Sequence, residues 1–155
     1  MNPPVPGYNH GAVGWQRAGN ALAAVAVVLV MIARGQPWWV LPAAFLAFDI
    51  SALGFLVNWR VGALCYNLVH NYAAPAVLLA GWAVLQLSQV SADWLAMLAA
   101  CWGFHVAVDR ALGFGLKIGP FDHTHLGIIG ASRGPEADWS ARDAPPPHRR
   151  WRRGR

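Results

Sequence analysis

The stretch AGNALAAVAVVLVMIA, residues 18–33, contains no ionisable side chain and is almost entirely apolar. A soluble domain normally distributes charge along its whole length, because each of its helices has one face in water. Of the 155 residues, 56% are hydrophobic and nine are tryptophan, and most of the charges lie near the C-terminus. Residues 18–33 are therefore predicted to cross a membrane, although about 20 residues are typical of such a helix.

Three further apolar stretches follow, separated by short polar turns. The predicted spans are residues 18–33, 38–57, 61–85 and 94–112. The turn Asn58-Trp59-Arg60 is too short for anything but a hairpin, so neighbouring spans run antiparallel. We expect an all-α fold, a four-helix transmembrane bundle, within residues 15–130. Its two cysteines, Cys65 and Cys101, have no pairing or metal-type spacing and are interpreted as packing residues.

The two ends of the chain have a different composition. Residues 1–14 are rich in Pro and Gly and are expected to form a flexible leader in which no helix starts, and the Arg/Pro-rich residues 131–155 are expected to be disordered. A signal peptide is an alternative for the first span, but the leader before Arg17 is long and the cleavage site is poor. The basic tail around Trp151 would suit nucleic acid, yet no recognition fold remains outside the spans, so nucleic acid is not expected as a partner.

Four ionisable residues lie inside the predicted spans, where each costs about 2.5 to 3.5 kcal/mol at mid-bilayer on insertion scales. They are Asp49, His70, His105 and Asp109. Counted from the cytoplasmic helix ends at about 1.5 Å per residue, Asp49, His70 and His105 lie at one depth. His105 and Asp109 are four residues apart and share a helix face. Three helices are thus predicted to direct polar side chains into one layer.

Neighbouring residues fit the same layer. Tyr66 and Asn67 lie one turn before His70 and can hydrogen-bond around its imidazole. Pro75 removes a helical amide, so the third span should bend just above His70. Arg110 and Lys117 are expected to reach lipid phosphates or to receive an anionic head group.

Imidazoles and carboxylates in this combination suit a divalent metal such as zinc, iron or manganese. The predicted ligands are Asp49, His70, His105 and Asp109, completed from the cytoplasmic side by His123 or His125 of a His-Thr-His segment. The alternative is a buried hydrogen-bond network that only holds the bundle together.

Several motifs resemble those of a known family. They are Tyr-Asn-Leu-x-His at residues 66–70, His-x-x-x-Asp-Arg-x-x-Gly-x-Gly-Leu-Lys at residues 105–117 and Thr-His-Leu at residues 124–126. Over about residues 15–127 the chain resembles a family of small bacterial membrane proteins, domain of unknown function 4260. The resemblance implies a bacterial plasma-membrane location and a four-helix core, and it supplies no activity.

Three classes of function are compatible with these features. The preferred one is a metal-dependent membrane enzyme acting on a lipid or other apolar substrate near the cytoplasmic leaflet, with Asp49, His70, His105 and Asp109 as metal ligands or as acid and base. Tyr66, Asn67, Arg110 and Lys117 would contact the substrate. The second is a small proton-coupled transporter, which with four helices would need to form a homodimer. The third is a structural or accessory membrane subunit.

The positive charges predict the orientation. Of the 12 Lys and Arg residues, only Arg34 falls on the opposite face from the others, so both termini are expected to be cytoplasmic in the plasma membrane. A reporter that is active only in the cytoplasm, fused after Arg155, should therefore be active. Activity of a periplasmic reporter at the same position would show that a span was miscounted or that the first span is cleaved.

Overall fold

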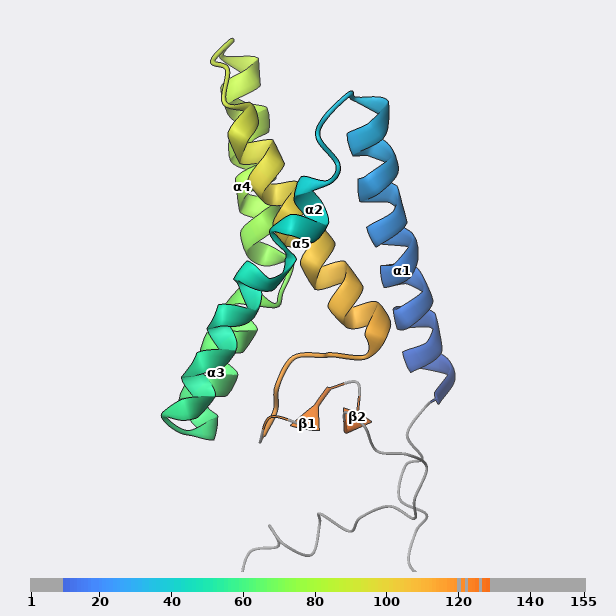
Figure 1. Cartoon of the computed structure of the whole chain (residues 1–155), viewed down its shortest axis with the longest axis vertical. Helices are drawn as coiled ribbons and strands as arrows, with labels where there is room; N and C mark the ends of the chain where they lie inside the picture. Colours follow the sequence, from blue (N-terminus) through green and yellow to red (C-terminus); the bar gives the residue numbers. More distant parts are fainter. Residues whose placement is uncertain (1–9, 120, 122, 126, 129–155) are drawn as a thin grey trace, which may run out of the picture.

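The computed structural model describes residues 10–119, 121, 123–125 and 127–128 (Figure 1). In chain order its elements are α1 (His10–Ala33), α2 (Val40–Ala43), the 3-10 helix η1 (Phe45–Leu56), α3 (Trp59–Val69), α4 (Ala73–Leu87), α5 (Asp93–Leu112), β1 (His123–Thr124) and β2 (Gly127–Ile128). The expected all-α bundle with antiparallel passes is confirmed, and the two short strands form one small antiparallel pair. The predicted tail, residues 131–155, lies outside the described residues.

Helix α1 begins earlier than the sequence analysis expected. The prediction that no helix starts within residues 1–14 is wrong for its last turn, because α1 already includes His10. The last proline before the helix is Pro6, so every residue of α1 retains the amide that a helix requires.

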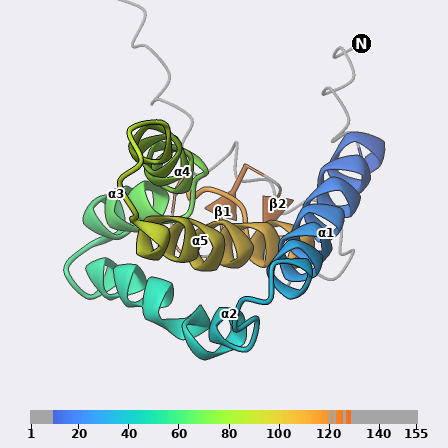
Figure 2. The same ribbon diagram turned by 90° about the horizontal axis from the view of Figure 1, so that it is seen from above.

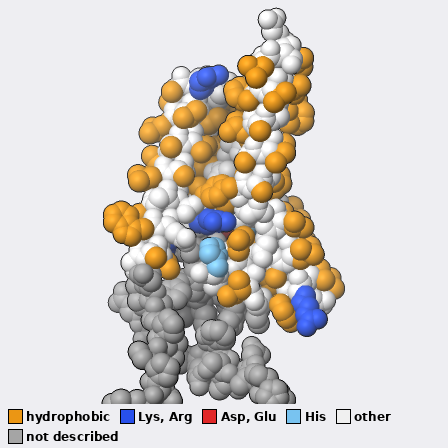
Figure 3. Space-filling view, turned by 180° about the vertical axis from the view of Figure 1, so that it is seen from behind, with side chains coloured by type: hydrophobic (Ala, Val, Ile, Leu, Met, Phe, Trp, Pro, Cys, Tyr) orange, Lys and Arg blue, Asp and Glu red, His pale blue; other side chains and the backbone are white. Residues whose placement is uncertain are grey.

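Three helical segments are long and apolar enough to cross a membrane: Gly11–Ala33, Trp59–Leu87 and Asp93–Leu112. The outer surface agrees with lipid contact, because large apolar side chains such as Leu22, Leu64 and Val77 are exposed. Hydrophobic side chains cover much of the face that Figure 3 shows. The buried side chains include small residues and several polar ones. Exposing so large an apolar surface to water is unfavourable, whereas exposing it to lipid is not.

The predicted second span, residues 38–57, is not a single α-helix. It consists of the short α2 followed by twelve residues of 3-10 helix. Its contacts recur every third residue, since Phe45 and Phe48 pack on the ring of His105 and Ser51 approaches His70. A 3-10 helix aligns residues three apart, so this geometry presents all of these side chains in one row. At about 2.0 Å per residue, η1 is also about 24 Å long, which is longer than an α-helix with the same number of residues.

The third predicted span, residues 61–85, is interrupted at His70. Helix α3 ends at Val69 and α4 begins at Ala73, so the predicted bend beside His70 is a complete break. The side chain of Asn71 partly compensates for the lost helical bonds, because its Oδ1 accepts from the amide of Ala73 at 2.7 Å and its Nδ2 donates to the Leu68 carbonyl at 3.0 Å. The break places His70 at a helix end inside the bundle.

Helix α5 is the central element. It packs against α1 on one side and against α4 on another, while η1 lies along α3 (Figure 2). Two side chains tie its end and its middle to other helices. Nε of Arg17 in α1 donates to the Ala111 carbonyl at 2.9 Å, and Nε1 of Trp102 donates to the Val69 carbonyl at 2.6 Å. The second bond joins α5 to the end of α3 beside His70.

Helix η1 approaches α3 closely at two glycines. A Cβ atom added to Gly54 would lie 3.1 Å from Cβ of Cys65 and 3.2 Å from Cα of Gly62. A Cβ atom added to Gly62 would collide with the ring of Phe55. This contact sets how near η1, which carries Asp49, lies to the end of α3.

Replacing Gly62 by alanine should therefore destabilise the protein. The collision with Phe55 costs about 1 to 3 kcal/mol, which outweighs the gain of about 1 kcal/mol in helix propensity. Gly81→Ala in α4 is the matched control, because nothing lies within 4 Å of its added Cβ and only the propensity gain remains. Thermal unfolding in detergent, followed by circular dichroism, should give a lower midpoint for Gly62→Ala alone. An unchanged midpoint would mean that η1 does not need this close approach.

Candidate metal centre

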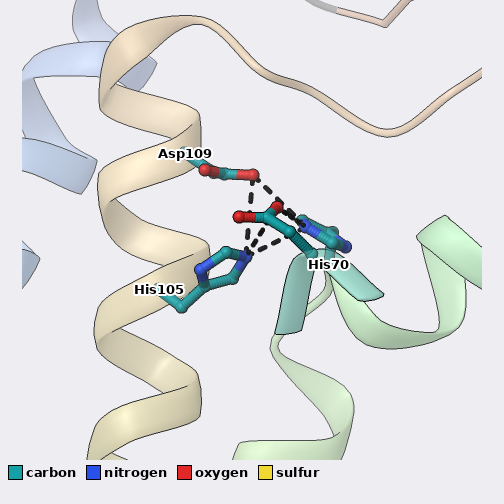
Figure 4. Close-up of side chains that lie close together, drawn as sticks. His70, His105 and Asp109 are labelled. Carbon is teal, nitrogen blue, oxygen red and sulfur yellow. Dashed lines mark hydrogen bonds and ion pairs between the residues drawn. The ribbon is translucent and has the colours of Figure 1, made fainter. Parts of the chain in front are cut away.

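Four side chains from three parts of the chain converge inside the bundle. They are Asp49 of η1, His70 at the end of α3, and His105 and Asp109 of α5. One ligand atom from each lies within 4.8 Å of all the others, and Figure 4 shows His70, His105 and Asp109 directed toward one another. The predicted convergence of these four side chains is confirmed.

The distances suit a shared ion. The Nε2 atoms of His70 and His105 are 2.9 Å apart. Nε2 of His70 is 3.4 Å from Oδ1 of Asp49 and 3.4 Å from Oδ2 of Asp109, and Nε2 of His105 is 3.8 Å from each of these oxygens. Ligand atoms bonded at about 2.0 to 2.1 Å to one tetrahedral ion lie about 3.3 to 3.4 Å apart. The observed separations fall on both sides of that value, so these four groups can hold a metal ion.

Hydrogen bonds orient His70 as a ligand. Its Nδ1 lies 3.0 Å from the Tyr66 carbonyl, which can only accept, so Nδ1 carries the proton. The hydroxyl of Ser51, whose proton goes to the Phe48 carbonyl, is 3.4 Å from the same nitrogen. In the neutral ring, Nε2 then presents its lone pair to the centre of the cluster. A carbonyl on the distal nitrogen is the usual support of a metal-binding histidine.

His105 is positioned by packing instead. Its fully buried ring lies 4.5 Å from the ring of Phe45 and 5.2 Å from that of Phe48, measured between centroids. Within the described part of the chain, its Nδ1 forms no hydrogen bond of ordinary geometry, and the backbone of Phe45 is the polar group that His105 approaches besides the cluster. Because His70 offers a lone pair at 2.9 Å, either a proton on Nε2 of His105 or a metal ion must lie between the two nitrogens.

Tyr66 supports two members of the cluster. Its hydroxyl donates to Oδ2 of Asp109 at 3.0 Å, and its ring stacks on the imidazole of His70 with centroids 3.5 Å apart. The side chain is buried, so these contacts leave it no access to lipid. Tyr66 is thus a positioning residue for the cluster, in agreement with its predicted place one turn before His70.

Asn67 and Lys117 hold the segment after α5 against α3. Nδ2 of Asn67 donates to the Lys117 carbonyl at 2.8 Å, and the Lys117 amide donates to Oδ1 of Asn67 at 2.7 Å. Gly113, with φ 103°, turns the chain back at the end of α5. The expectation that Lys117 reaches lipid phosphates is wrong, because its side chain is buried, with Nζ donating to the Phe121 carbonyl and lying 4.6 Å from the Tyr66 ring centroid.

Arg110 is not one of the four cluster residues but lies beside His70. Its Nη2 is 3.5 Å from the carbonyl of His70, and its guanidinium lies 5.1 Å from the ring centroid of Tyr72. Its Nε is buried and has no hydrogen-bond partner among the described residues. The guanidinium therefore keeps most of its donors available for a ligand.

The His-Thr-His segment does not complete the cluster through His125. Nδ1 of His125 accepts from the Leu116 amide at 2.8 Å, and the residue is not a member of the four-residue group. The side chain of His123 lies outside the described part of the structure. Sequence reasoning also missed Ser51, Phe45 and Phe48, although their spacing of three residues around Asp49 is a signal that a 3-10 helix would explain.

These features define a class: an all-helical protein with three segments able to cross a membrane and a buried His/Asp cluster. The chain belongs to the family described as domain of unknown function (DUF4260), whose model matches residues 14–129. The resemblance drawn from the motifs is confirmed, and the matched region contains all four cluster residues. No curated protein and no solved structure matches the chain.

The environment of His125 gives a test of the segment after α5. Burial and the charge of Arg110 lower the pKa of His125 below its ordinary value of 6.5. The unfolded chain then binds more protons between the two pKa values, so the stability contributed by the neutral ring is present above about pH 6.5 and is lost as the pH falls through the lower folded-state pKa.

From about pH 7.5 to about pH 5 the thermal midpoint of the wild type should fall more steeply than that of His125→Asn. The asparagine oxygen can accept from the Leu116 amide, as Nδ1 does, but it does not titrate in this range. Thermal unfolding of both proteins in the same detergent across this range gives the comparison. Equal slopes would show that His125 does not contribute to the acid sensitivity of the fold.

Proposed function

We propose that this protein is a metal-dependent membrane enzyme that acts on a lipid or other apolar substrate near the cytoplasmic leaflet. A divalent zinc, iron or manganese ion would be held by Asp49, His70, His105 and Asp109. The observation that carries the proposal is the 2.9 Å separation of the two Nε2 atoms, with a carboxylate oxygen of each aspartate within 3.8 Å of both.

Charge favours a metal at this position. Two carboxylates and two neutral imidazoles would bring a net charge of about −2 into an apolar bundle, and unpaired charge is costly there. A divalent cation would neutralise both carboxylates while using the lone pairs of both histidines. Protonation would be the other way to remove the charge.

Unequal exposure of the four ligands favours catalysis over a closed structural site. The side chain of Asp49 is 41% exposed, whereas that of Asp109 is 10% exposed and both histidines are buried. Catalytic metal sites keep a position open to water or substrate, and structural sites are closed by protein ligands. A bound ion would supply Lewis acidity and lower the pKa of water. Because four protein ligands would close a tetrahedral site, in the catalytic form His70, His105 and Asp109 would keep the ion, and the more exposed Asp49 would leave the fourth position open and accept or return a proton there.

The location of the substrate follows from the helix ends. His105 is seven residues from the end of α5, which corresponds to about 10 Å along the helix. With both termini in the cytoplasm, the open side of the cluster would lie within the inner half of the plasma membrane. Among the predicted substrate-binding residues we retain Arg110, because Tyr66, Asn67 and Lys117 are engaged within the protein.

A proton-coupled transporter is the second candidate, and one observation favours it. Tyr66, Asp109, His70 and His105 form a continuous series of hydrogen-bonding groups, and the distance between the histidines also suits a proton shared by two nitrogens. In that function the same residues would titrate without binding metal. A structural or accessory subunit would also need no metal.

Metal content separates these functions. Protein purified in mild detergent without chelators should contain about one zinc, iron or manganese ion per chain by elemental mass spectrometry. His70→Ala and His105→Ala should each strongly lower the metal content, because each removes one of the two nitrogen ligands. His125→Asn is the matched control, since it removes a histidine outside the cluster and should retain the metal.

Retained helical content, measured by circular dichroism, must accompany metal loss for the result to support the site. Metal-free wild-type protein, or metal that survives both alanine substitutions, would exclude the shared centre. Turnover is the second readout: wild-type protein incubated with mixed membrane lipids should change the mass of at least one lipid, and Asp49→Asn should abolish the change. Stoichiometric metal without turnover of any membrane lipid would indicate a structural site.

A further inference from the structure

A second feature of the bundle is an apolar groove between α1, α4 and α5. Its volume is about 590 Å³, within the range of small-molecule sites. Its floor is formed by small residues of α5: Ala96, Ala100, Gly103 and Ala107. Figure 3 shows the hollow lined by hydrophobic side chains, with a basic side chain at its lower end.

The groove lies on the opposite side of α5 from the candidate metal centre. Gly103 and Ala107 are each two residues from His105, and two residues correspond to about 200° around an α-helix. The two sites therefore occupy different faces of one helix. A ligand in the groove would not displace any of the four proposed metal ligands.

The groove is closed at one end by a polar contact. The hydroxyl of Tyr72 donates to Oδ1 of Asn20, which joins the start of α4 to α1. Tyr72 itself lines the groove and stacks with the guanidinium of Arg110. Arg110 follows Gly103 by seven residues, which places both on the same face of α5. Arg110 does not line the groove itself but stands behind Tyr72 at this end, whereas Arg34 and Asp93 line the other end.

The dimensions of the groove suit one hydrocarbon chain. From Ala96 to Ala107 the floor is about 16 Å long at about 1.5 Å per residue. That is about half of the hydrocarbon core of a bilayer, which is about 30 Å thick. A chain lying along the floor would contact alanine and glycine, whose small side chains leave room for it.

Arg110 determines which kind of polar head group a ligand of the groove would carry. Its one hydrogen bond to the protein among the described residues is long, at 3.5 Å, and its Nε has none. A guanidinium binds a carboxylate through charge-assisted hydrogen bonds, and because Nε is buried and Nη2 lies beside the His70 carbonyl, the remaining donors are those of Nη1. In an apolar environment, an anion is the partner that such a cation requires.

We propose that this groove binds a long-chain fatty acid, with its carboxylate on Arg110 and its chain along Ala96, Ala100, Gly103 and Ala107. A single chain fits the groove, whereas a diacyl phospholipid carries a second chain that would have to remain outside. The binding stands independently of the metal centre. That the bound acid is the substrate rests on the proposed function, because Arg110 also contacts the carbonyl of the proposed ligand His70.

Binding of hexadecanoate to delipidated full-length protein in detergent, measured by native mass spectrometry, tests the groove. Hexadecanoate should bind saturably with one molecule per chain, and hexadecanol, which has the same chain and no charge, should bind at least about tenfold more weakly. Arg110→Gln should weaken hexadecanoate binding by a similar factor. Equal binding of acid and alcohol, or full binding to Arg110→Gln, would refute the head-group assignment.

Gly103→Leu should abolish binding, because its side chain would enter the groove, where the nearest atom to an added Cβ is 3.9 Å away on Pro75. Gly81→Leu is the matched control outside the groove, and it should bind like the wild type with a similar thermal midpoint. Unchanged binding to Gly103→Leu would place the acid elsewhere. If a diacyl phosphatidic acid displaces hexadecanoate at equal concentration, the occupant is a phospholipid and the proposal is wrong.

His105→Ala separates this inference from the proposed function. It should lose metal but keep hexadecanoate binding, because the groove lies on the other face of α5. If wild-type protein contains no metal but still binds hexadecanoate, the proposed enzyme function is wrong and the proposed fatty-acid site is supported. Loss of hexadecanoate binding in a folded His105→Ala protein would contradict the independence of the two sites.

Discussion

The imidazoles of His70 and His105 impose the arrangement of the surrounding helices. Their Nε2 atoms lie 2.9 Å apart inside a bundle whose outer surface is apolar. Neither His70 nor His105 can face lipid without a large cost, so α5 must pack against the end of α3. Asp49 must reach the same point from η1, and Asp109 follows His105 by one turn. The carbonyl and hydroxyl of Tyr66 then satisfy two of these groups at once. The polar layer thus determines which helix faces meet.

The backbone adapts to this layer in two places. Helix η1 has 3-10 geometry, which aligns Phe45, Phe48 and Ser51 toward the histidines, and its close approach to α3 depends on Gly54 and Gly62. The third pass is interrupted so that His70 lies at a helix end, where its neighbour Asn71 compensates for lost backbone bonds. Regular α-helices in these two passes would not present the same side chains to the centre.

Helix α5 connects two sites of different chemistry. One face carries His105 and Asp109, which suit a cation, and the opposite face carries small residues that line an apolar groove. Arg110 stands near both, because it contacts the carbonyl of His70 and stacks on Tyr72 at the closed end of the groove. A polar centre next to an apolar groove is consistent with the proposed action on an amphiphilic molecule.

The sequence by itself determined the all-helical fold, the antiparallel passes and the identity of the four converging residues. These features follow from local properties: apolar runs partition into lipid whatever their neighbours are, and an ionisable residue within such a run must turn inward. The tertiary structure alone decided the 3-10 form of η1, the complete break at His70, the burial of Lys117 and the exclusion of His125 from the cluster. Each of these depends on contacts between segments far apart in the chain, such as Asn67 with Lys117, and no local pattern encodes such contacts.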